Sequence, residues 1–206
     1  MTDIKLTLIN KSNDVNNSEI VIFQKNVATD FEELAVAWQV VKNLGQGWSH
    51  SFTYPATWAA GASDNDGNQS PLKAVKPGQQ LNVVQTPHGH DLVMGSPATA
   101  PQEIEISNQL PQGAINASIY KNRKLLAVKT TVAPGQKAVF AFKPTIFIGV
   151  VSEVAEGDVM DSAVISDINT EISLLGIASA DIVMTGGGTG PDAVPFAFNL
   201  ENVQMA

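Results

Sequence analysis

Two of the chain's three histidines lie one residue apart, beside an aspartate, in the stretch QTPHGHDL. His88, His90 and Asp91 could supply three ligands to zinc, iron or copper and leave a fourth position open for water, and His50 could add a nitrogen ligand. However, Thr86-Pro87-His88-Gly89 also fits a type I turn, with proline second and glycine fourth. Since a turn tip gives metal ligands little support, a hairpin turn is favoured over a metal centre.

A second candidate is the polar stretch ASDNDGNQS, which resembles the first half of a calcium-binding loop. Asp64, Asp66 and Asn68 occupy the first, third and fifth loop positions. Gln69 stands where glycine is expected, and Val75 stands where the bidentate acid is expected. A polar hairpin loop is therefore favoured over a calcium site, because Asp-Gly is itself a turn signal. A weak calcium site is also conceivable in a later acidic run, which is better explained as a solvated loop: Glu153, Glu156, Asp158 and Asp161.

A third candidate is the aromatic stretch WSHSFTYP. Its alternation places one set of side chains on a single strand face, namely Trp48, His50, Phe52 and Tyr54. If that face is exposed, it could bind a sugar ring or a partner subunit. If it points inward it belongs to the core, which is the favoured interpretation.

Motifs of the common enzyme classes are absent from the sequence. There is no Gly-x-Ser-x-Gly elbow, no phosphate-binding Walker loop and no His-Glu-x-x-His. The run GGGTG at 186–190 lacks dinucleotide-binding glycine spacing and is followed by Pro191. A protein without enzymatic activity is expected.

The elements that would position these residues are strands. Apolar and polar residues alternate with period two near 4–8, 103–106, 115–120 and 194–201, as half-buried antiparallel strands require. The apolar runs EIVIFQ and TIFIGVV predict strands covered on both faces. Pro-Gly pairs at 77–78 and 134–135 and Asp66-Gly67 predict turns, and GSPATAP at 95–101 predicts a crossover or a hinge.

The expected fold is all-β. Residues 1–206 are expected to form a single domain, an antiparallel β-sandwich of jelly-roll or immunoglobulin-like type with roughly ten to twelve strands. Only the stretch TDFEELAVAWQVV has helical spacing, which predicts one short helix near residues 30–36.

Composition narrows the location and the partners. The chain has no cysteine and a net charge of −8. All 12 basic residues lie at or before Lys143, whereas nine of the 20 acids follow it. An acidic chain is a poor partner for nucleic acid. Without a signal-like N-terminus or an apolar run long enough for a membrane helix, the expected location is the cytoplasm.

These observations rank the possible functions. The first is a structural or interaction protein that assembles with itself into a homo-oligomer or filament, by docking a basic hairpin onto an acidic region. Its expected contacts are Lys121, Arg123 and Lys124, with Glu153, Glu156 and Asp158. The alternative is a lectin-like module that binds carbohydrate, with or without calcium. Less favoured are a membrane-active protein that inserts residues 161–190 as a hairpin, and a metalloenzyme built on the histidine pair.

Overall fold

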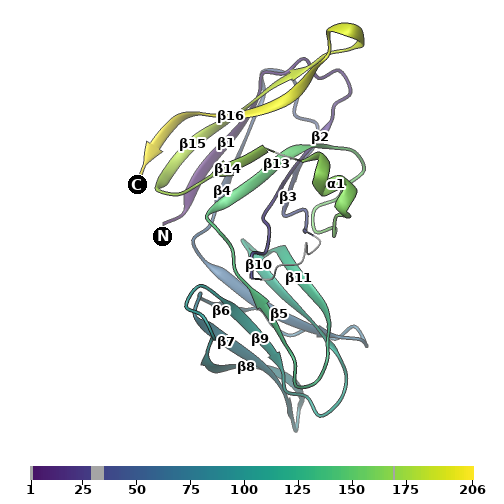
Figure 1. The fold of residues 1–206 in the computed structure, drawn as a ribbon, viewed down its shortest axis with the longest axis vertical. Helices are drawn as coiled ribbons and strands as arrows, with labels where there is room; N and C mark the ends of the chain where they lie inside the picture. The colour runs from purple at the N-terminus through teal and green to yellow at the C-terminus, as the bar shows by residue number, and fades with distance from the viewer. Residues whose placement is uncertain (1, 29–34, 169) are drawn as a thin grey trace. The chain divides into compact units, whose positions relative to one another are not determined.

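Strands make up nearly all of the regular structure, which confirms the all-β fold class. The computed structural model describes residues 2–28, 35–168 and 170–206, and these form sixteen strands, one α-helix and one 3-10 turn (Figure 1). Sixteen exceeds the expected ten to twelve strands, because several are only three or four residues long. The helix expected near residues 30–36 falls mostly on 29–34, outside the described residues. Val36 forms an isolated bridge with Val159.

Contacts divide the chain into two compact units. The first unit comprises Met1–Lys25, Leu34–Ala56 and Pro144–Ala206, and the second comprises Asn26–Glu33 and Thr57–Lys143. The single domain expected over 1–206 stays a prediction, because compactness does not reveal whether the units unfold together. The uneven charge follows this division: the first unit has twelve acidic and four basic residues, and the second has eight of each.

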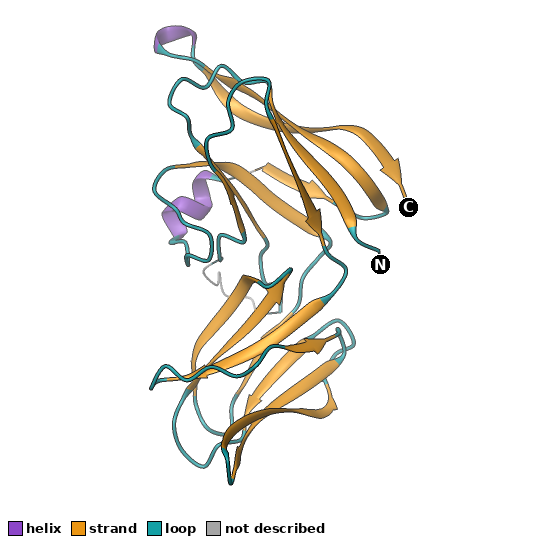
Figure 2. Cartoon of the chain, turned by 180° about the vertical axis from the view of Figure 1, so that it is seen from behind, coloured by secondary structure: helices purple, strands orange, loops and turns teal. Residues whose placement is uncertain are grey.

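The first unit contains two four-stranded sheets, ordered β16-β15-β1-β4 and β14-β13-β2-β3 (Figure 2). Its elements are β1 (Ile4–Asn10), β2 (Glu19–Phe23), β3 (Gln39–Val41), β4 (Ser49–Tyr54), β13 (Thr145–Val151), α1 (Ser162–Asp167), β14 (Thr170–Ser173), β15 (Ile177–Gly187), the 3-10 turn Gly190–Asp192 and β16 (Val194–Met205). Strand β1 pairs with β15 in parallel, which departs from the antiparallel expectation. Apolar side chains from β2 and from the segments around α1 pack into one buried cluster that includes Val21, Phe23 and Ile168.

The second unit also contains two four-stranded sheets, ordered β11-β10-β5-β6 and β12-β9-β7-β8. Its strands are β5 (Trp58–Asp64), β6 (Lys73–Val75), β7 (Gln79–Thr86), β8 (Gly89–Pro97), β9 (Ile104–Asn108), β10 (Ile115–Lys121), β11 (Lys124–Val132) and β12 (Lys137–Phe140). Because β7 and β9 pair in parallel, the chain must cross over between β8 and β9. Residues 98–101 of GSPATAP lie in this connection, whereas Gly95, Ser96 and Pro97 belong to β8.

The two Pro-Gly turns share one hydrogen-bonding pattern. Gly78 and Gly135 have φ of 87° and 78°, a conformation that favours glycine. In each turn the following glutamine side chain accepts a hydrogen bond from the backbone N–H three residues earlier, Lys76 N to Gln79 Oε1 at 2.9 Å and Ala133 N to Gln136 Oε1 at 3.4 Å. The two Pro-Gly-Gln segments therefore form the same kind of turn.

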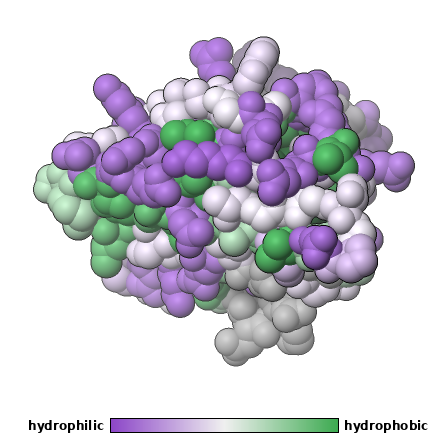
Figure 3. All heavy atoms as spheres, turned by 90° about the horizontal axis from the view of Figure 1, so that it is seen from above, coloured by the Kyte–Doolittle hydropathy of each residue, from purple (hydrophilic) through white to green (hydrophobic). Residues whose placement is uncertain are grey.

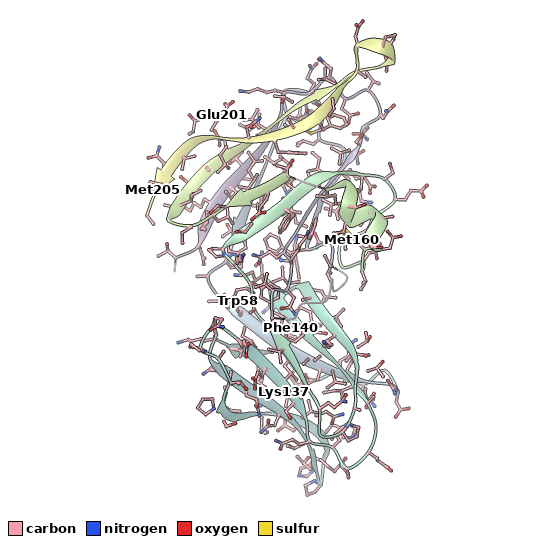
Figure 4. All side chains as sticks on the ribbon, in the orientation of Figure 1. Trp58, Lys137, Phe140, Met160, Glu201 and Met205 are labelled. Atoms are coloured by element: carbon pink, nitrogen blue, oxygen red, sulfur yellow. The ribbon has the colours of Figure 1, made fainter. Side chains whose placement is uncertain are left out.

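One carboxylate is buried in the second unit. Glu105 on β9 has a side chain only 1% exposed, and its Oε1 accepts hydrogen bonds from Lys137 Nζ at 2.7 Å and from the Thr99 amide at 3.0 Å (Lys137 is labelled in Figure 4). Burial raises the pKa of Glu105, but these hydrogen bonds together act more strongly, so the pKa lies below its ordinary value. Among the described residues, Oε2 has no hydrogen-bond partner. The buried negative charge of Glu105 is therefore stabilised by hydrogen bonds from Lys137 and Thr99.

We predict that Lys137→Met lowers the free energy of unfolding by about 1–3 kcal/mol at neutral pH, because a buried acceptor loses its charged donor. A carboxyl with a lowered pKa stabilises the fold above its unfolded-state pKa and loses that contribution as pH falls through the folded-state pKa. The difference in the free energy of unfolding between the wild type and the variant should therefore become smaller in acid. Urea unfolding at several pH values measures this difference. Lys73→Met is the matched control, since Lys73 lies 3.8 Å from a half-exposed Asp91; an equal loss in both variants would contradict the account.

Candidate functional site

Two polar segments that are distant in sequence line one hollow of about 460 Å³ in the second unit. One follows β5 and the other is the β7–β8 hairpin, so the calcium-like loop and the histidine pair lie together. The lining residues are Ala62, Ser63, Asp64, Asp66, Asn68, Gln69, Ser70, Pro71, Val83, Gln85, His88, Gly89, His90, Asp91, Leu92 and Ile115. Ser63, Gln69, Ser70 and Gln85 also line the hollow, although no motif marks their side chains as ligand-binding.

The Asp64 carboxylate organises the loop that forms one wall. Its Oδ1 accepts hydrogen bonds from the backbone N–H groups of Asp66 at 3.0 Å and Asn68 at 2.9 Å, and its Oδ2 accepts one from Asn68 Nδ2 at 2.9 Å. The Asn68 side chain is the main reason that the pKa of Asp64 lies below its ordinary value, and nearby His90 contributes in the same direction. The loop is therefore closed by its own aspartate, as in an Asx turn.

The opposite wall is a tight hairpin. Strands β7 and β8 pair up to Thr86 and Gly89, which leaves Pro87 and His88 as a two-residue tip, where the sequence predicts a turn. Thr86 Oγ1 donates a hydrogen bond to the Gly89 carbonyl at 2.8 Å and accepts one from the His88 amide at 3.2 Å. His90 lies next on β8, and its Nδ1 is 3.5 Å from Asp64 Oδ2. This contact links the two walls.

The hollow does not group its acidic and imidazole side chains as a metal site. In the described part of the chain, no three or more histidine, cysteine, aspartate or glutamate side chains are arranged to hold a metal ion. The Asp64 oxygens are occupied by the loop, and His50 belongs to β4 in the first unit. The proposed ligands His88, His90, Asp91, Asp66 and Asn68 therefore share a hollow without forming a coordination sphere.

The aromatic face of β4 mostly points inward. Tyr54 is buried and Phe52 half-buried, and both rings meet Trp38 edge-on, with centroids 5.9 and 6.3 Å away. Burial raises the pKa of Tyr54 to about 12. His50 is half-buried, with Nε2 3.3 Å from Gln39 Nε2. Only Trp48 is largely exposed, at 69%, so most of this face belongs to the core.

The basic hairpin expected to dock on a neighbour lies between β10 and β11. Lys121 is buried, and its ammonium lies 3.8 Å from the Trp58 ring centroid, so it cannot serve as a surface contact. Arg123 is exposed and Lys124 half-buried. The acidic partners Glu153, Glu156 and Asp158 are exposed in the loop before α1. Docking between copies through these charges stays a prediction.

The region expected to insert as a membrane hairpin, residues 161–190, contains α1, β14 and all of β15. In the described residues, no helix has the length and apolar character needed to cross a membrane. The face shown in Figure 3 is mostly hydrophilic, with hydrophobic side chains in small groups among hydrophilic ones. Small apolar areas of this kind are ordinary on protein surfaces.

We predict that Asn68→Ala raises the pKa of Asp64 toward its ordinary value, because the variant removes the hydrogen bond that contributes most to the lowered pKa. The carboxyl-carbon chemical shift of Asp64, followed by NMR through an acid titration, measures this. Gln69→Ala changes the neighbouring side chain and leaves the Asp64 hydrogen bonds in place, so it should not move the midpoint. An unchanged titration midpoint of Asp64 in Asn68→Ala would show that the Asn68 side chain is not the main cause of the lowered pKa.

Comparison of the chain with protein-family models, curated proteins and solved structures finds no match.

Proposed function

We propose that this protein is a non-enzymatic binding module whose second unit holds a small polyhydroxylated ligand, of the carbohydrate class, in the hollow between the Asp64 loop and the β7–β8 hairpin. The observation that carries the proposal is the meeting of these two polar segments around one space of about 460 Å³. Small-molecule sites typically have volumes of roughly 300–1,000 Å³.

The chemistry of the walls suits hydroxyl groups. Amide side chains such as Gln69 and Gln85 both donate and accept hydrogen bonds, and carboxylates such as Asp66 and Asp91 accept them. Val83, Leu92 and Ile115 also line the space but are buried, so the accessible side chains of its walls are mainly polar. Polar groups of this kind fix the orientation of a ligand through hydrogen bonds.

A second, smaller hollow extends the candidate binding surface. It has a volume of about 210 Å³ and shares Ala62, Ser63, Gln69 and Ser70 with the first. It adds Gly61, Leu72, Ser118 and Tyr120. Aromatic rings offer an apolar surface beside a polar hydroxyl, so a second sugar unit could lie against Tyr120. This favours an oligosaccharide over a single sugar.

We predict that a glycan array screened with the intact protein identifies a ligand, and that Gln69→Ala and Gln85→Ala each weaken its binding about tenfold, as expected for one lost hydrogen bond of about 1–1.5 kcal/mol. Isothermal titration calorimetry measures the dissociation constants. Gln109→Ala is the matched control, because Gln109 is an exposed glutamine of the same unit that does not line either hollow.

Two further measurements separate this proposal from its alternatives. Binding that disappears with Trp48→Ala, but survives Gln85→Ala, would place the ligand at the first unit and contradict the proposal. Binding that is lost when a chelator is added would show that the site requires calcium. Binding that survives the chelator would show that the side chains of the hollow hold the ligand without a metal ion. An array without any ligand would contradict carbohydrate as the ligand class.

A further inference from the structure

The sheet β16-β15-β1-β4 of the first unit ends in two open edges. In the part of the chain that the structure describes, β4 pairs with β1 alone and β16 pairs with β15 alone. An open edge presents backbone N–H and C=O groups that can pair with a strand of another chain. Natural proteins usually obstruct such edges with proline, charge or bulges, so the two edges can be compared by these features.

The β16 edge carries several of these obstructions. Pro195 near its start has no N–H to donate, and Asn202 near its end has φ of 50°. The register between β15 and β16 is interrupted three times. Glu201 adds a charge and lies 3.3 Å from Lys11 (Glu201 and Met205 are labelled on this strand in Figure 4). Continuous pairing along β16 is therefore hindered.

The β4 edge carries none of them. Ser49–Tyr54 contains no proline and no aspartate, glutamate, lysine or arginine, and it pairs with β1 without a break in register. Ser49, Ser51 and Thr53 are exposed. Trp48, immediately before the strand, is 69% exposed. Tryptophan is enriched at the centre of protein interfaces, so an exposed tryptophan beside an unobstructed edge is a second feature typical of a contact surface.

We propose that β4 pairs antiparallel with β4 of a second copy, and that the protein forms a two-fold symmetric dimer through this edge. An antiparallel pairing of identical strands uses the same surface on both copies, and such contacts close at two subunits. The head-to-tail alternative would place β4 against β16 of the next copy. Because β1 is parallel to β15 and antiparallel to both β4 and β16, that contact would be a parallel pairing on the obstructed edge.

The alternation along β4 limits the register of the dimer. His50, Phe52 and Tyr54 point inward, so a continuous sheet must place inward residues opposite inward residues. Two such registers, centred on Ser51 and on Phe52, each pair five residues of β4. The second would set Pro55, which has no N–H to donate, opposite Ser49, so the register centred on Ser51 is favoured. This register sets Ser49 opposite Thr53 of the second copy and brings each exposed Trp48 opposite the second copy's Tyr54.

We predict that the wild-type protein dimerises reversibly in sedimentation-velocity runs over a concentration series, and that Ser49→Lys with Thr53→Lys raises the dissociation constant at least about tenfold. Lysines would then lie directly opposite lysines, which destabilises a strand pair. Ser49→Glu with Thr53→Lys instead sets glutamate opposite lysine and should restore the dimer. Both positions are exposed, so the fold is retained, and circular dichroism checks it.

The matched control places the same charges on the other edge. Ala197→Lys with Asn199→Lys changes two exposed residues of β16 and should leave dimerisation unchanged. A protein that stays monomeric, or a dimer broken by the β16 pair or by Arg123→Glu with Lys124→Glu but not by the β4 pair, would overturn the proposal. Failure of the Glu–Lys pair to restore the dimer would overturn the register. Ligand binding in the second unit is a separate measurement, so the two proposals fail independently.

Discussion

The requirement that each strand bury one face and pair its backbone governs the rest of this structure. Alternation satisfies the first part: β1 buries Ile4, Leu6 and Leu8 and turns the residues between them outward. Pairing is satisfied inside each four-stranded sheet and left incomplete at its edges. Polar loops at strand ends and unpaired edges remain available for binding, and the hollow and the β4 edge are such places.

The hollow shows how local and tertiary interactions combine. Asp64 closes its loop through hydrogen bonds within five residues of chain, and Thr86 closes the hairpin tip in the same local way. Neither interaction requires the other segment. The space between them exists because β5 and β7 belong to different sheets of one unit, which brings two independently formed loops together. Since its walls form locally, the hollow needs little rearrangement to accept a ligand.

The sequence predicts local structure better than pairing. Alternation located β1, β9, β10 and β16, and Pro-Gly located two turns, because both signals depend on neighbouring residues. The parallel pairing of β1 with β15 joins residues about 170 positions apart, as in Leu6 with Ala180, and no local pattern encodes it. The helix α1 lies in the region expected to insert as a hairpin, and it begins where the Asp161 side chain accepts a hydrogen bond from the Val164 amide. The sequence predicts only some of the residues that line the hollow. Gln69 and Gln85 line the same space only because the fold brings their two segments together.

Charge and pairing act in opposite directions in the proposed dimer. The first unit carries twelve acidic residues against four basic ones, so two copies repel each other at a distance. Salt screens that repulsion, with a Debye length of about 8 Å at physiological ionic strength. Backbone hydrogen bonds and the burial of Trp48 act only at contact and depend little on salt. A dimer held by the uncharged β4 edge should therefore tighten as salt increases, whereas docking of Arg123 and Lys124 onto an acidic loop should weaken. The direction of the salt dependence thus distinguishes an interface made by strand pairing from one made by opposite charges.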